Sequence, residues 1–203
     1  MFKNLKIDYI SLYIICYNNI LLIIQYNNQI KGDTMLTKNL QTALVEQLNR
    51  EFHSAYIYLG MSAYCSKEGF NGASSWFLVQ YQEEVAHGMK MFRYLEDQGA
   101  EIQLPDIKAV KVSYKSLLDV FKKSLAHEEF MTKNLNNLSD IAMKEKDHAT
   151  YNLLQWYVTE QIEEESTLNE IIDHIKLVGD NGYGLYTIDK ELATRVFVDP
   201  TAV

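Results

Sequence analysis

The feature of this sequence that most restricts its fold is a set of four apolar stripes with helical spacing, each interrupted by glutamate near its middle. Members of a stripe recur three or four residues apart, which places them on one face of a helix. The stripes are Leu44-Leu48-Glu51-Ala55-Tyr58, Phe77-Tyr81-Glu84-Gly88-Met91, Phe121-Leu125-Glu128-Thr132-Leu135 and Leu153-Tyr157-Glu160-Glu164-Leu168-Ile171. The acids therefore point where a core should form, and a buried carboxylate is costly unless a cation meets it.

One of the stripes also carries an imidazole. Glu84 and His87 form a Glu-x-x-His pair, whose side chains can reach one point from the same side of a helix. The pair alone is a weak signal, but it gains weight from Glu51, Glu128 and Glu164 on the other stripes. Oxygen-rich ligation with a single histidine favours iron or manganese over zinc or copper. One carboxylate that bridges, most simply Glu84, would hold two metal ions close together.

Size, charge and cysteine content narrow the class of protein. The chain has 203 residues and a formal net charge of −8, which argues against nucleic-acid binding and suits attraction of cations. Its two cysteines, Cys16 and Cys65, form neither a disulfide framework nor a paired metal motif. A reducing compartment is the simpler interpretation, so we predict a cytoplasmic protein. No membrane partner is expected.

Residues 1–34 differ in composition from the rest: isoleucine, leucine, tyrosine and asparagine dominate, and alanine and glutamate are absent. Polar residues interrupt this segment too often for a membrane span, which needs roughly 20 nearly uninterrupted apolar residues. A signal anchor remains an alternative because the start is basic. Our hypothesis is an atypical extension, either disordered or translated from upstream sequence, since residues 31–33 can be encoded by a purine-rich ribosome-binding sequence. The domain would then span 35–203.

The remainder predicts four long helices and a short one. We expect helices from about Thr37 to Ser66, from the Asn71-Gly72 turn to Asp97, from 116 to about 145, from about 148 to 179, and from about 187 to 194. Residues 100–115 contain a proline and lack a clean period, so they should form a long crossover. Two helical hairpins joined by one crossover make an all-α, ferritin-like four-helix bundle with a short C-terminal fifth helix.

Five motifs beyond residue 35 point to a known family. They are Leu48-Asn49-Arg50-Glu51 with Tyr58 two turns on, Gln82-Glu83-Glu84-x-x-His87, His127-Glu128, Leu154-Gln155-Trp156-Tyr157-Val158-x-Glu160-Gln161-x-Glu163-Glu164-Glu165, and Gly184-Leu185-Tyr186-x-Ile188-Asp189-Lys190-Glu191-Leu192. In this combination the chain, from Met35 to about Thr194, resembles the bacterial non-haem ferritins.

The resemblance implies the roles of individual residues. It assigns a first iron to Glu51, Glu84 and His87, and a second to Glu84, Glu128 and Glu164. It assigns a third iron position to Glu83, Glu160 and Glu163, with Glu164 shared. Gln161 would line the centre, and Tyr58 would take part in oxidation. The family implies a shell of twenty-four identical subunits that oxidises Fe(II) with O2 or peroxide and stores the ferric mineral, serving iron storage and detoxification.

Two positions in the sequence argue against haem binding. Haem-containing bacterioferritins carry a second Glu-x-x-His pair on the fourth long helix, and the matching residues here are Gln161 and Glu164. An oxygen ligand in place of an imidazole should weaken the second site, which suits a centre that passes iron onward. Val85 stands where a haem-binding relative would need methionine. Haem is therefore not expected.

Three other functions remain open on the sequence alone. A di-iron oxygenase or peroxidase acting on an organic substrate would need a substrate pocket and a reductase partner, of which the sequence gives no sign. A helical scaffold without metal would need basic residues that reach the glutamates from neighbouring faces. A DNA-protecting mini-ferritin would place its iron between subunits and carry basic tails, whereas this domain is acidic.

Overall fold

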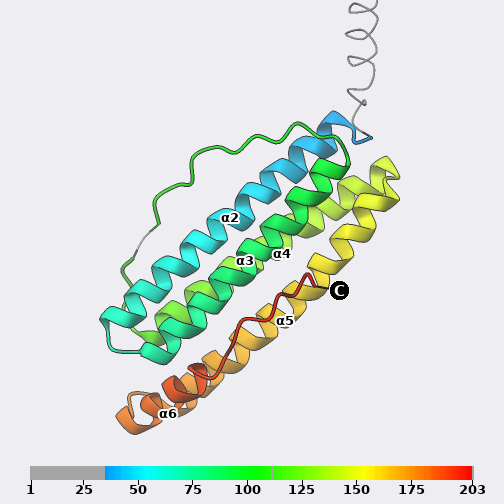
Figure 1. Ribbon diagram of the computed structural model, residues 1–203. Coiled ribbons are helices and arrows are strands. Elements are labelled where there is room, and N and C mark those ends of the chain that lie inside the picture. The colour runs from blue at the N-terminus through cyan, green and yellow to red at the C-terminus, as the bar shows by residue number, and fades with distance from the viewer. Residues whose placement is uncertain (1–34, 111, 203) are drawn as a thin grey trace, which may run out of the picture. The chain divides into compact units, whose positions relative to one another are not determined.

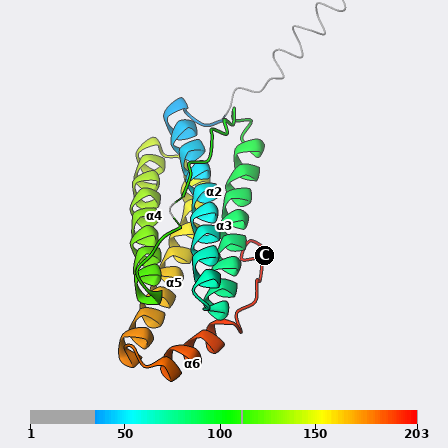
Figure 2. The same cartoon turned by 90° about the vertical axis from the view of Figure 1, so that its left-hand side faces the viewer.

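The computed structural model describes residues 35–110 and 112–202. The expectation of an extension over 1–34 lies outside these ranges. Within them the chain forms helices and no strands: α2 (Lys38–Lys67), α3 (Asn71–Asp97), α4 (Leu117–Glu145), α5 (His148–Val178) and the short α6 (Gly182–Leu192). Helix α2 packs along α3 and α4 along α5, so that two hairpins form one bundle (Figures 1 and 2). The predicted ferritin-like bundle is confirmed.

The long crossover joins the two hairpins from end to end. It leaves α3 after Asp97, runs beside α2 and enters α4 at Leu117 (Figure 1). Polar side chains of α2 hold its first part, since the Gln41 amide donates to the Glu101 carbonyl at 3.2 Å and the Asn49 amide to the Gln103 carbonyl at 3.0 Å. Among the helices that the structure describes, none combines the length and the apolar character that a membrane crossing requires.

The predicted helix starts rest on side-chain caps. Thr37 Oγ1 accepts a hydrogen bond from the Leu40 N–H at 3.2 Å, and Ser116 Oγ accepts one from the Asp119 N–H at 3.2 Å. Each bond satisfies a backbone donor that the first turn of a helix leaves unpaired. The carboxylate of Asp119 reaches back to the Lys115 N–H at 3.0 Å, one residue earlier than a capping box would require.

The short helix begins earlier than the sequence analysis expected, at Gly182 rather than Thr187. The Asn181 side chain accepts from the Gly184 N–H at 2.9 Å and caps the first turn. A Cβ on Gly184 would lie 2.7 Å from Cβ of Val178, so this glycine permits close packing of α6 on the end of α5. Gly182 and Gly184, which precede the predicted helix, therefore lie inside the observed one.

Helix α6 crosses the end of the bundle and docks on the start of α3 (Figure 2). Asp189 Oδ1 accepts a hydrogen bond from the Ala73 N–H at 2.9 Å, and so caps a helix whose own N-cap residue, Phe70, makes no side-chain bond. The approach is so close that a Cβ on Gly72 would lie 1.6 Å from the Asp189 carbonyl oxygen. Gly72 is therefore required for α6 to dock.

Two apolar clusters fill the bundle. The tryptophan cluster, towards α6, includes Trp76, Phe77, Phe121, Leu168 and Ile188. The leucine cluster, towards the start of α2, includes Leu40, Leu44, Leu48, Leu135 and Leu154. The glutamates of the four stripes lie along the chain between the members of these clusters, so a polar layer separates the two parts of the core.

A pair of glycine substitutions tests the docking of α6. Alanine normally stabilises a helix relative to glycine by up to about 1 kcal/mol. Gly72→Ala should nevertheless lower the free energy of unfolding by about 1–3 kcal/mol, because its methyl group overlaps the α6 backbone. Gly182→Ala is the matched control, since no atom lies within 4 Å of its added Cβ. Urea unfolding measures both variants, and equal stability of the two would contradict the docking contact.

Candidate metal centre

Five side chains from four helices converge at the middle of the bundle. Glu51 comes from α2, Glu84 and His87 from α3, Glu128 from α4, and Glu164 from α5. The first group consists of Glu51, Glu84 and His87, each offering one ligand atom, and these atoms lie within 4.8 Å of one another. The second group consists of Glu84, Glu128 and Glu164 and meets the same limit. Glu84 belongs to both groups, so it is placed where a bridging carboxylate would be.

Burial makes this arrangement costly without a cation. Glu51, Glu84, His87 and Glu128 are each 1–2 % exposed, and Glu164 is half-buried. In the described part of the chain, Glu84 Oε2, His87 Nε2 and Glu164 Oε2 are buried without a hydrogen-bond partner. An unsatisfied buried polar atom costs about 1–3 kcal/mol. The orphaned oxygens and nitrogen face the space between the helices, and their donor set suits iron.

The carboxyls respond to this environment with raised pKa values. Burial raises the pKa of Glu51 to about 7, against the hydrogen bond from Gln47, and the charge of Glu128 adds to the rise. Burial likewise raises the pKa of Glu128 to about 7. The pKa values of Glu84 and Glu164 lie well above the usual range, first through burial and then through neighbouring carboxylates. Each group favours its proton unless another cation replaces it.

His87 is held ready for a metal. Burial lowers the pKa of its imidazole to about 4, so the ring is neutral at physiological pH and Nε2 can donate an electron pair. The Tyr157 hydroxyl donates to the His87 carbonyl oxygen at 2.7 Å, and the Trp156 ring meets the imidazole edge-on at 5.3 Å. Trp156 and Tyr157 thus pack around the candidate ligand.

Close packing of α2 and α3 brings their ligands together. A Cβ on Gly88 would lie 2.9 Å from the Phe52 ring, so the glycine lets the helices approach beside His87. This contact explains why the second stripe carries glycine one residue after the histidine.

Tyr58 and Gln161 both contact the same candidate ligand. The Tyr58 hydroxyl donates to Glu128 Oε1, and the Gln161 amide donates to Glu128 Oε2 at 3.0 Å. Tyr58 is fully buried and also stacks on Phe77 with ring centroids 6.0 Å apart. The tyrosine therefore packs in the core and also contacts the candidate centre.

Two glutamines that the sequence analysis missed support the other carboxylates. Gln47 donates to Glu51 Oε1 at 2.8 Å, and the Arg50 guanidinium donates to the Gln47 carbonyl at 3.3 Å. Gln47 is buried one turn before Glu51. Its position on the glutamate face of the helix was a signal that could have identified it.

The second glutamine repeats this pattern with a distant arginine. Gln80 donates to Glu164 Oε1 at 2.8 Å, and Arg195 donates to the Gln80 carbonyl at 2.9 Å. Gln80 lies one turn before Glu84, which is again a recognisable spacing. Arg195 comes from the segment after α6, and no local sequence pattern indicates its contact.

The residues predicted for a third iron are arranged differently. Glu83 is paired with Arg195 at 2.5 Å, and Glu160 Oε2 lies 3.9 Å from His87 Nε2. Glu163 is exposed. Within residues 35–110 and 112–202, these three do not form a group of ligand atoms as close as the two groups above. All three line one cavity of about 350 Å³, together with Glu164 and Arg195.

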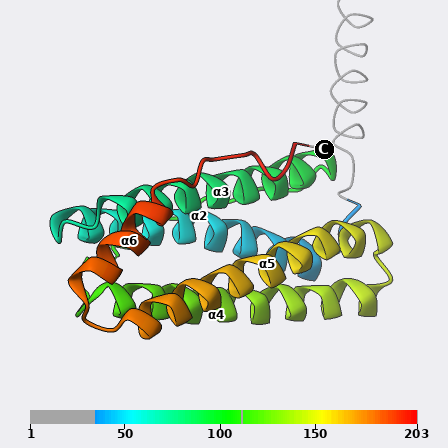
Figure 3. The ribbon, with the colours of Figure 1, turned by 90° about the horizontal axis from the view of Figure 1, so that it is seen from below.

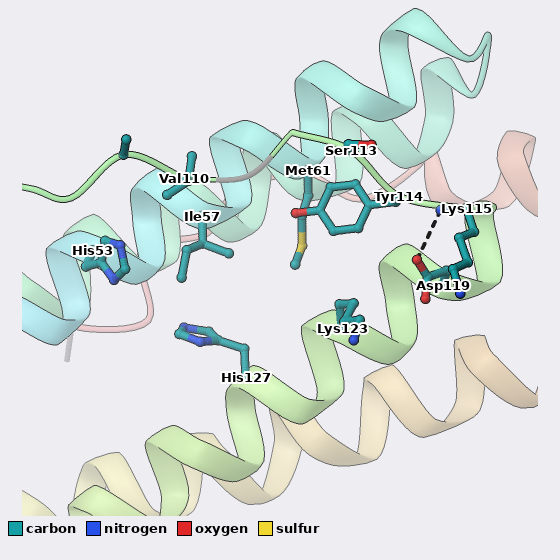
Figure 4. A pocket seen from close by; sticks show the side chains of 11 residues that line it. His53, Ile57, Met61, Val110, Ser113, Tyr114, Lys115, Asp119, Lys123 and His127 are labelled. Atoms are coloured by element: carbon teal, nitrogen blue, oxygen red, sulfur yellow. Dashed lines mark hydrogen bonds between the residues drawn. The ribbon is translucent and has the colours of Figure 1, made fainter.

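Two further residues lie outside the centre. His127 lies next to Glu128 in the sequence, and its Nε2 lies 2.7 Å from Ser54 Oγ. It lines a separate pocket of about 710 Å³ with His53, between α2, α4 and the crossover (Figure 4). Glu165 is half-buried, and its carboxylate accepts a hydrogen bond from the Thr132 hydroxyl.

Comparison with known proteins identifies relatives over most of the chain. A family model described as a ferritin-like domain matches residues 41–178. Bacterial non-heme ferritins of Staphylococcus epidermidis and Staphylococcus aureus are 44% and 41% identical over 163 residues, which cover 80% of this chain and 98% of each relative. A humanized archaeal ferritin superposes with a TM-score of 0.79 at 42% identity, over 80% of this chain and 99% of that one. An open-pore ferritin from Archaeoglobus fulgidus gives 0.78 at 40% identity, over 79% and 99%.

The raised pKa values predict coupling between metal and protons. Between about pH 4.5 and 7 the folded protein binds protons at Glu51 and Glu128 that the unfolded chain releases, so the free energy of unfolding of chelator-treated protein should fall as pH rises through this range. Binding of a divalent metal at pH 6 should release protons from these carboxyls, because the pKa values of Glu51, Glu128, Glu84 and Glu164 are all raised. Calorimetry in buffers of different ionisation enthalpy measures this release, and binding without proton release at pH 6 would contradict the assignment.

Proposed function

The chain belongs to the ferritin family, and from this premise we propose that it oxidises Fe(II) at the four-helix centre and stores the ferric product within a shell of its own copies. The observation that carries this proposal is the pair of ligand groups that share Glu84. Ferrous ions are the substrate. Two observations support a centre without haem. The bacterial relatives carry the name non-heme ferritin, and Gln161 and Glu164 stand where a second Glu-x-x-His pair would be.

The residues have distinct parts in the proposed reaction. Glu51 and His87 would hold the first Fe(II), Glu128 and Glu164 the second, and Glu84 both. Two ferrous ions side by side supply two electrons together, which reduce O2 to peroxide as protons are taken up, leaving two ferric ions. The carboxylates neutralise the metal charge and set the spacing of the ions.

Glu128 has the most closely supported position. Tyr58 and Gln161 each occupy one of its oxygens, so the carboxylate is held in a fixed orientation towards the second group. The Tyr58 hydroxyl is near enough to exchange a proton with this ligand, and its phenol is an oxidisable side chain bonded directly to a ligand carboxylate. We propose Tyr58 as the residue that takes part in oxidation.

Release of the product would follow the acidic cavity beside the second group. Glu164 of the second group and His87 of the first both line this cavity, and of the two side chains Glu164 is the more exposed. Glu83, Glu160 and Glu163 line this cavity and would provide the third position. Transfer of ferric ions along it would deliver them to the mineral. Assembly into twenty-four subunits, use of O2 or peroxide, and a cytoplasmic location are parts of the proposal that rest on the family.

The alternatives fit the centre less well. In a metal-free scaffold each buried carboxylate oxygen would need a cation or a hydrogen bond, yet within the described residues Glu84 Oε2 and Glu164 Oε2 have neither. The oxygenase alternative has no observation in its favour.

Substitutions at the shared and the imidazole ligands test the oxidation step. Glu84→Gln and His87→Ala should each slow Fe(II) oxidation by more than about tenfold, since loss of a residue that only supports a ligand already costs 10- to 100-fold in other metal sites. Glu129→Gln is the matched control, because Glu129 is exposed on α4. Stopped-flow absorbance measures the rates and circular dichroism checks that the helices persist. Oxidation at the control's rate in both variants would reject the assignment.

Storage is tested separately from oxidation. Aerobic addition of Fe(II) to the purified protein should yield a particle far larger than one subunit that retains many irons per subunit. Size-exclusion chromatography followed by iron counting measures both quantities. A small particle that retains only a few irons would reject storage and leave the two-metal centre unaffected.

A further inference from the structure

The chain after α6 folds back over the centre. Residues 193–202, here called the tail, run beside α3 (Figure 3). Phe197, Asp199 and Thr201 border a groove with Val85 and Met89 of α3. Closer to the centre, Val198 and Pro200 complete the wall of the acidic cavity. The tail thus covers the side of the bundle on which His87 and Glu164, one ligand from each group, line the cavity.

Arg195 anchors this tail with three contacts. Its guanidinium donates to Glu83 Oε2 at 2.5 Å and to the Gln80 carbonyl oxygen at 2.9 Å. Its plane also covers Trp76, with 4.3 Å from Cζ to the ring centroid. The Arg195 side chain is 25 % exposed and that of Glu83 is 17 % exposed, so solvent screens their attraction only in part. These contacts are specific to a planar, forked cation.

The guanidinium is the charge that balances the acidic cavity. Burial lowers the pKa of Arg195, and the charges of Glu83, Glu164 and Glu163 act in the opposite direction, so three carboxylates face the same cation. Of the ion pairs made by the described residues, Arg195–Glu83 is the one that joins an arginine or lysine to a residue predicted for the centre. Lys90 also attracts Glu160, but without an ion pair.

We propose that Arg195 competes with iron for the third position, and that an ion bound by Glu83, Glu160 and Glu163 displaces the guanidinium and releases the tail. This proposal rests on the proposed function, because it concerns the route by which iron leaves the centre. A metal ion and Arg195 both require the Glu83 carboxylate, and two cations sharing one cavity repel each other. The tail then acts as a gate that opens when a metal ion binds the acidic cavity beneath it.

Displacement of Arg195 should also affect Glu164, a member of the second ligand group. With Arg195 bound, the Gln80 carbonyl faces the guanidinium and its amide faces Glu164. Loss of Arg195 removes the partner that fixes this orientation. The amide is then free to rotate and to release the Glu164 oxygen that it holds. Occupation of the third position thereby changes the hydrogen bonding of a ligand to the second iron.

Zinc provides a redox-inert probe of the competition. Calorimetric titration of the purified protein with Zn²⁺ should resolve two tighter equivalents and a weaker third. In Arg195→Gln the third equivalent should bind about tenfold more tightly, within the usual range of coupling between sites. Arg195→Lys keeps the charge but loses the forked contacts and the stacking on Trp76, so its third equivalent should bind with an affinity between those of wild type and Arg195→Gln. Lys176→Gln is the control for loss of one positive charge on α5, since Lys176 pairs with exposed Asp173.

Trp76 provides an optical readout of the tail. The chain has two tryptophans, so Trp76 is observed alone in a Trp156→Phe background. The third zinc equivalent should change its emission, because the guanidinium leaves the ring, and this change should be absent when Arg195→Gln is added. An unchanged third affinity in Arg195→Gln, no third equivalent in either protein, or emission that ignores the third equivalent would overturn the proposal.

The same titration separates this proposal from the proposed function. If the first two equivalents fail to bind while the third still depends on Arg195, the two-metal centre is rejected and the competition stands. If the first two equivalents bind and the affinity for the third does not depend on Arg195, the two-metal centre stands and the competition is rejected.

Discussion

A layer of carboxyl groups between two apolar clusters is the constraint on which the rest of this structure depends. Four helices each contribute at least one acid to it, and burial alone would drive them to hold protons or to turn outwards. They stay inward because the clusters on both sides fix the helix faces, and because amides and a phenol occupy some of the oxygens. The oxygens left over define where a cation fits.

Much of this arrangement was predictable because it is periodic. The four stripes place Glu51, Glu84, His87, Glu128 and Glu164 on core-facing sides, and the structure brings these residues together in two groups. Helix ends at Thr37 and Ser116 followed from cap chemistry. The roles of the residues as iron ligands remain predictions. The positions of these residues were predictable because the spacing along each helix decides which side chains face the core.

The unpredicted features depend on contacts between distant segments. Helix α6 begins early because it packs against Val178 and against the start of α3. The sequence near residue 182 does not indicate these contacts. Arg195 contacts residues more than a hundred positions away in the chain. Gln47 and Gln80 stood at informative spacings, yet a neutral side chain on an apolar face attracts less notice than a charged one. Two arginine–glutamine–glutamate series, one on each ligand group, became visible only in the structure.

The docking of α6 on Gly72 has a kinetic consequence for the arginine that follows it. Helix α6 ends at Leu192, so Arg195 is attached by a very short tether to a point fixed on α3. Short flexible tethers give local concentrations in roughly the millimolar range. A guanidinium held in this way cannot be diluted away, and it returns to the same carboxylate whenever that carboxylate becomes free. The fold thereby carries a built-in counterion whose supply does not depend on the surrounding solution.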